Sequence, residues 1–167
     1  MNIYKLLKLN RVVKNHRIKF LALYLLHKLK MRYLAVNLDP VMACNLRCKM
    51  CYFTDEDYVK TLKGQFKEEE INQVAKTIFK RALKLQIGCG TEPTLYKDLV
   101  KIVELGKAYK VPYISITTNA NLLDEEKIEA LLKAGLNEFT ISLHGVNKES
   151  YENFMKKASY EKFHNAF

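Results

Sequence analysis

The sequence predicts an α/β fold, a parallel sheet in which about four strands alternate with helices. Four short runs of apolar and β-branched residues alternate with segments whose apolar residues recur every three or four positions, as in amphipathic helices. Strands separated by helices pair in parallel through right-handed crossovers. Each cluster of unusual polar or sulfur-bearing residues directly follows one of the four runs. Because the carboxyl ends of parallel strands meet at one edge of a sheet, these clusters predict one shared site.

Composition and charge divide the chain into two parts. Its 167 residues are 49% hydrophobic and include only three prolines, enough for one domain with a buried core. Of the 28 basic residues, nine lie within residues 1–38, which contain no acidic residue. The other 19 lie within residues 39–167, which also contain all 18 acidic residues. We therefore predict a basic helical extension over residues 1–32 and a nearly neutral core over residues 33–167.

The basic extension contains a predicted helix at residues 15–30, with Ile18, Leu21 and Leu25 on one face. Its apolar run, residues 20–26, is too short for a membrane span, which needs about 20 residues. An anionic partner, a membrane surface or RNA, is one interpretation of the positive charge. The other is a helix that docks on the barrel with its lysines in solvent, which we favour. It predicts no nucleic-acid partner and no transmembrane segment.

The first half of the core starts with a predicted strand at residues 33–39, which Pro40 ends. Apolar residues at helical spacing follow at positions 71, 74, 75, 78, 79 and 82, with charged residues between them. The second strand is predicted at residues 83–88.

The second half repeats this alternation. A helix at about residues 97–110 is followed by a strand at 113–118, a helix at 124–135, a strand at 138–143 and a short helix at 148–157. The predicted inner faces of the first two helices carry Leu99, Ile102, Val103, Gly106, Ile128, Leu131 and Leu132. Three acids favour the start of the helix at 124–135, and Gly135 is its predicted left-handed cap.

Three cysteines follow the first strand at spacings of four and three: Cys44, Cys48 and Cys51. Iron–sulfur clusters usually take four thiolates, so three would leave one iron open to another ligand. A four-thiolate zinc site completed by Cys89 is the alternative, although structural zinc cysteines usually come in pairs. Four cysteines without a secretory signal indicate a cytoplasmic, metal-binding protein rather than a disulfide framework.

The other three predicted strands end in residues suited to a polar ligand. The second strand runs into Gly-Cys-Gly-Thr-Glu-Pro (residues 88–93), the third into Thr-Thr-Asn-Ala-Asn (117–121), and the fourth into Ser142 and His144. Glycine permits close approach of the backbone, and a carboxylate attracts an ammonium group. We interpret Cys89 as a buried residue at a strand end rather than a ligand. His144 has two interpretations, a side chain that faces the substrate or one that forms a hydrogen bond within the loop.

Together these motifs resemble the radical S-adenosylmethionine enzymes, over about residues 33–150. The resemblance implies a [4Fe–4S] cluster on Cys44, Cys48 and Cys51, whose open iron binds S-adenosylmethionine. Electron transfer to the sulfonium then releases a 5′-deoxyadenosyl radical, which abstracts hydrogen from a substrate. Peptide maturation and cofactor biosynthesis are both common in such proteins. A flavodoxin- or ferredoxin-like protein is the implied electron donor.

The resemblance also suggests which residues contact S-adenosylmethionine. They are Met50 and Tyr52 near the adenine, Gly90, Thr91, Glu92 and Pro93 near the amino group, and Thr118, Asn119 and Ser142 near the ribose and carboxylate. The sequence departs from the family pattern in three places. Met50 stands where an aromatic residue is common, Cys89 and Thr91 interrupt the glycine–glutamate motif, and Ala120 replaces a frequent glycine.

The family barrel has six strands, of which this sequence supplies four, so we expect a core that is incomplete at its C-terminus. A further C-terminal region or a partner chain would supply the rest. The alternative function is a non-catalytic zinc or iron–sulfur module left by truncation.

Overall fold

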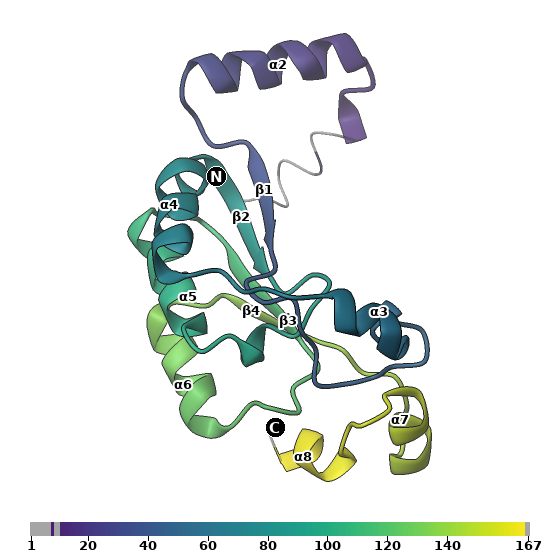
Figure 1. The fold of residues 1–167 in the computed structure, drawn as a ribbon. Helices are drawn as coiled ribbons and strands as arrows, with labels where there is room; N and C mark the ends of the chain where they lie inside the picture. The colour runs from purple at the N-terminus through teal and green to yellow at the C-terminus, as the bar shows by residue number, and fades with distance from the viewer. Residues whose placement is uncertain (1–7, 9–10, 166–167) are drawn as a thin grey trace.

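The central element is a sheet of four parallel strands, as predicted (Figure 1). The structure is a computed structural model that describes residue 8 and residues 11–165. The sheet has the order β1–β2–β3–β4, so each strand lies beside its neighbour in sequence. The strands are β1 (Leu34–Leu38), β2 (Ala82–Ile87), β3 (Ile114–Thr118) and β4 (Glu138–Ile141). Residues 1–7 and 9–10 of the predicted extension and residues 166–167 of the predicted core lie outside the described residues.

Three helices connect the strands and cover one face of the sheet: α4 (Glu68–Ile78), α5 (Leu99–Ala108) and α6 (Glu125–Ala134) (Figure 1). Leu85 and Ile87 of β2 pair with Ile114 and Ile116 of β3, and all four are fully buried against these helices. Side chains alternate between the faces of a strand. The opposite face therefore carries polar residues, where the Gln86 amide accepts a hydrogen bond from Ser115.

The predicted inner face of α5 is confirmed, because Leu99, Ile102, Val103 and Gly106 are all buried. Gly135 caps α6 with a φ of 98°, as predicted. The prediction that Leu132 is buried was wrong, since its side chain is 54% exposed. Successive helical residues are about 100° apart, so Leu132 points away from the sheet while its neighbour Leu131 packs onto it.

Several short elements were not predicted. They are η1 (Tyr52–Thr54), α3 (Glu56–Thr61), η2 (Phe79–Arg81), η3 (Pro93–Leu95) and α8 (Tyr160–Asn165). Each has six residues or fewer, too few for a helical period to be visible in the sequence. The predicted last helix is present as α7 (Lys148–Phe154).

The helices α7 and α8 fold back toward the cysteine loop. Tyr151 and Met155 are buried together with Leu46 in a second hydrophobic cluster, against which Cys44 and Cys48 pack. The backbone joins the same segments, because the Arg47 amide donates to the Lys156 carbonyl (2.8 Å) and the Lys49 amide to the Phe154 carbonyl (2.9 Å). The loop that carries the cysteines is thus supported by the end of the described chain, more than 100 residues away.

The helix of the basic extension, α2 (His16–Lys28), does not dock on the sheet. None of its residues is buried, and Figure 1 shows it beyond the start of β1, clear of the other helices. The expectation that Ile18, Leu21 and Leu25 pack on the barrel was therefore wrong: these side chains are 55%, 58% and 49% exposed. The helices α4, α5 and α6 already occupy the apolar face of the sheet, and its other face is polar. Among the described residues, no helix is both long and apolar enough to cross a bilayer.

Candidate cofactor site

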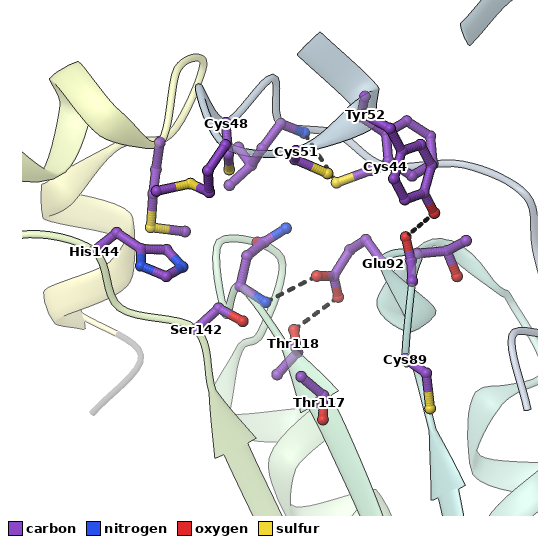
Figure 2. A pocket seen from close by; sticks show the side chains of 18 residues that line it. Cys44, Cys48, Cys51, Tyr52, Cys89, Glu92, Thr117, Thr118, Ser142 and His144 are labelled. Carbon is purple, nitrogen blue, oxygen red and sulfur yellow. Dashed lines mark hydrogen bonds between the residues drawn. The ribbon is translucent and has the colours of Figure 1, made fainter. Parts of the chain in front are cut away.

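A cavity of about 240 Å³ lies between the cysteine loop and the carboxyl ends of the strands (Figure 2). It brings together segments that follow all four strands. Of the twelve predicted site residues, eleven line it: Cys44, Cys48, Met50, Cys51, Tyr52, Gly90, Thr91, Glu92, Thr118, Asn119 and Ser142. The twelfth, Pro93, is buried as the first residue of η3 and lies against Gly88. The parallel sheet thus collects in one place residues that are up to 98 positions apart.

Cys44, Cys48 and Cys51 lie on the loop side of the cavity, across from Glu92 (Figure 2). Burial raises the pKa of Cys44 to about 11, although the amide of Leu46 donates to its sulfur at 3.4 Å and opposes the shift. Burial also raises the pKa of Cys48. Without a positive partner these thiols hold their protons, whereas an iron ligand must be a thiolate. The positive charge of a bound metal group would therefore stabilise the thiolate forms of Cys44 and Cys48, which the protein alone does not stabilise.

The donor set is compatible with a cluster held by three cysteines, because Cys44, Cys48 and Cys51 line one cavity. A cluster places its cysteine ligands on separate irons, so the thiols need to surround a common space rather than a single ion. Within the described ranges, no group of three His, Cys, Asp or Glu side chains is arranged to hold one metal ion.

Cys89 does not join the other three thiols. Its sulfur points away from them (Figure 2) and lies 3.9 Å from the Gln86 carbonyl. The residue is also exposed, so the prediction of a buried cysteine was wrong. Cys89 lies in the loop after β2, beyond the buried residues of the strand, where it lines an outer part of the same cavity. This placement gives no support to a zinc site completed by Cys89.

Asp39 holds the loop after β2 in place, a role that the sequence did not reveal. Its carboxylate accepts hydrogen bonds from the amides of Cys89 (2.7 Å) and Gly90 (3.2 Å) and from the Thr91 hydroxyl (3.0 Å). Tyr52 reaches the same loop from the other side, where its hydroxyl donates to the Gly90 carbonyl. One feature of the sequence could have indicated this role of Asp39. It is an acidic residue directly after the first strand, at the edge of the sheet where the strand ends form the site.

Glu92 joins the ends of β2 and β3. The side chain is only 2% exposed, and one carboxylate oxygen accepts from the hydroxyls of Thr94 (2.6 Å) and Thr118 (2.7 Å) and from the Thr94 amide (3.2 Å). The other oxygen accepts from the Asn119 amide at 2.8 Å. Three of these donors share one oxygen, so the oxygen that accepts from Asn119 keeps an acceptor position for a further donor. Glu92 can therefore join the strand ends and also contact a ligand in the cavity that it lines.

Two asparagines extend these links across the site. The Asn119 side chain donates to Asn45 of the cysteine loop (2.9 Å). Asn121 donates to the Tyr151 hydroxyl (2.7 Å) and accepts from the Ser159 amide (2.7 Å). Between them, Ala120 has a φ of 62°, so the turn adopts a left-handed backbone without the glycine common in the family. Sequence analysis assigned no role to Asn45 or Asn121, because their partners are distant in sequence.

The remaining cavity residues differ in exposure. Met50 and Tyr52, both proposed near the adenine, are 56% and 45% exposed, and both line the cavity. Ser142 and His144 line it from the end of β4 (Figure 2). His144 thus lines the cavity, as the substrate-facing alternative requires.

Gly88 sets the direction in which the chain leaves β2, and its replacement tests the close packing there. A Cβ atom would lie 2.5 Å from both the Pro93 side chain and the Thr117 carbonyl, at a φ of 76°. We expect Gly88→Ala to lower the free energy of unfolding by about 3 kcal/mol, as measured by urea denaturation. Gly64→Ala is the matched control, because Gly64 has a φ of 118° but no atom within 4 Å of the added Cβ. Its expected cost is about 1 kcal/mol. Equal losses in the two variants would contradict the close packing.

Fold and cavity together define the class: part of a (β/α) barrel with a cavity of about 240 Å³ between its cysteine loop and the ends of its strands. The family model of the Radical SAM superfamily matches residues 39–167, and the chain belongs to this superfamily of enzymes. Its members bind a [4Fe–4S] cluster and S-adenosylmethionine, and they need an electron donor and a substrate.

Individual relatives agree with this assignment. The chain is 31% identical to the GTP 3′,8-cyclase of Aquifex aeolicus, over 80% of this chain and 42% of the relative. It is 37% identical to the probable GTP 3′,8-cyclase of Methanocaldococcus jannaschii, over 71% of this chain and 39% of the relative. The chain thus spans about two fifths of the curated relatives that it matches. Native anSMEcpe with bound AdoMet and Cp18Cys peptide has a similar fold, with a TM-score of 0.63 and 23% identity over 79% of this chain and 38% of that one.

Proposed function

We propose that this chain is the cofactor-binding part of a radical S-adenosylmethionine enzyme, with the cluster on Cys44, Cys48 and Cys51 and S-adenosylmethionine in the adjoining cavity. The observation that carries the proposal is the cavity itself, where three thiols face the loops that follow β2, β3 and β4 (Figure 2). When bound, the two cofactors supply a 5′-deoxyadenosyl radical that abstracts hydrogen from a substrate.

The protein's contribution is to position the cofactor and to limit solvent access. The loop of residues 88–93 offers backbone carbonyls to an ammonium group, and Asp39 and Tyr52 hold that loop in place. Glu92 fixes the distance between this loop and the turn at Thr118 and Asn119, whose polar groups suit a ribose and a carboxylate. Met50 and Tyr52 are the apolar surfaces available to the adenine, through a polarizable thioether and an aromatic ring.

The relatives suggest two classes of substrate. The curated relatives carry the name GTP 3′,8-cyclase, and a structural neighbour holds a peptide. The matched region covers 42% of the first of these proteins and 38% of the second, so more than half of each lies outside the comparison. Cofactor biosynthesis and peptide maturation therefore both remain within the proposal. We further propose a flavodoxin- or ferredoxin-like electron donor.

The test is a spectroscopic titration of the reconstituted protein. We expect S-adenosylmethionine to change the electron paramagnetic resonance signal of the reduced cluster. The Ser142→Ala variant should bind about 3- to 10-fold more weakly, because one hydrogen bond is lost. Thr140→Ala is the matched control, since Thr140 lies on β4, two residues before Ser142, and its hydroxyl donates to Glu138 at 3.1 Å. A cluster signal that S-adenosylmethionine leaves unchanged would refute the proposed cofactor site.

A further inference from the structure

The helix α2 is an apolar element that the described protein leaves uncovered. The side chains of Phe20, Leu21, Tyr24 and Leu25 are between 49% and 70% exposed. Val12 and Leu29, on either side of the helix, are 76% and 68% exposed. Burial of one such side chain contributes about 1.5–3 kcal/mol, so a helix of this composition favours an apolar environment.

The helix is nevertheless held at a defined place on the protein. Just beyond its end, the Arg32 guanidinium donates to the carbonyls of Phe79 (2.7 Å), Ala82 (3.0 Å) and Tyr109 (2.5 Å). His27, in the last turn of the helix, shares a hydrogen bond with the Tyr33 hydroxyl at 2.8 Å. These bonds attach the end of α2 to the start of the sheet, and the candidate cofactor site lies past the opposite ends of the strands (Figure 1).

The positive charge around α2 indicates which kind of partner can cover its apolar side chains. Residues 11–32 carry seven basic side chains and no acidic one: Arg11, Lys14, Arg17, Lys19, Lys28, Lys30 and Arg32. A second copy of the helix would bring together two groups of like charge, which is unfavourable. The core, with 19 basic and 18 acidic residues, has no excess negative charge to attract it. Nucleic acid would neutralise the cations but would gain little from aliphatic leucines, because its bases stack on aromatic rings.

We propose that α2 lies in the surface of an anionic lipid bilayer. Its apolar side chains enter the boundary between headgroups and acyl chains, and its lysines and arginines contact the negatively charged headgroups. The helix has 13 residues, too short to span the bilayer. Because α2 is attached at the opposite end of the sheet from the cofactor cavity, binding leaves the cavity directed away from the membrane and open to soluble partners.

Vesicle flotation of the 167-residue chain tests this proposal. We expect the protein to float with vesicles of phosphatidylglycerol and phosphatidylcholine and to remain behind with phosphatidylcholine alone. Replacing Leu21 and Leu25 together with serine should weaken binding about tenfold or more, through the loss of two apolar side chains. Replacing Arg17 and Lys28 with serine should also weaken it about tenfold, and high salt should have the same effect.

The matched control replaces Lys63 and Lys67 with serine, which removes the same charge from exposed positions on the core. We expect this control to bind within about twofold of the parent, because this segment lies beside the end of β1 and not beside its start, where α2 is attached. All variants should retain the helical circular dichroism of the parent. Binding that ignores the leucines, binding equal on neutral vesicles, self-association through α2, or preferential binding to RNA would each overturn the proposal.

Discussion

Replacing Cys44, Cys48 or Cys51 with serine should abolish the iron–sulfur cluster, whereas Cys89→Ser should leave it intact. After anaerobic reconstitution we expect about four irons and four sulfides per chain in the parent and in the Cys89 variant. The three cavity cysteines share one loop, and Cys89 points away from them (Figure 2). Iron and sulfide analysis with visible absorption measures the difference, because a cluster absorbs broadly and zinc does not.

Cys89→Ser serves as the matched control, since it makes the same change of sulfur to oxygen beside the same cavity. Loss of the cluster in this variant would show that a fourth thiolate takes part and would contradict the assignment of three ligands. Stoichiometric zinc without iron in the parent protein would instead favour the non-catalytic metal module.

Glu92→Ala should cause the second large effect, a loss of about 3 kcal/mol in the free energy of unfolding. The substitution removes the acceptor of four hydrogen bonds and leaves the Thr118 hydroxyl and the Asn119 amide without that partner in a buried place. Urea denaturation of the metal-free protein measures this loss without any contribution from cofactors.

The control is Glu104→Ala, because Glu104 is an exposed residue of α5. It should change the stability by less than about 0.5 kcal/mol. Glu92→Gln keeps the size of the side chain and one carbonyl acceptor, so its loss should fall between those of the other two variants. If Glu92→Ala were as stable as Glu104→Ala, Glu92 would not join the strand ends, and direct ligand binding would be its main role.

The sequence by itself determined the order of the elements and the location of the site. Alternation of strand and helix patterns implies a parallel sheet, and a parallel sheet brings the segment after each strand to a common edge. For that reason Cys44, Glu92, Asn119 and Ser142 could be assigned to one site before their distances were known. Local spacing was equally informative for α5, whose buried residues recur with the helical period.

Only the tertiary structure decided which hydrogen bonds the site residues form and which neighbouring residues hold them in place. Glu92 was predicted as a ligand contact, and the structure adds that its carboxylate accepts four hydrogen bonds from η3 and the end of β3. Asp39 and Asn121 act on partners 30 to 52 residues away, and such contacts leave no periodic trace in a sequence. The exposure of Cys89 and of α2 was also beyond sequence analysis. An apolar or sulfur-bearing side chain is buried only if another element covers it, and the placement of covering elements depends on the packing of the whole chain.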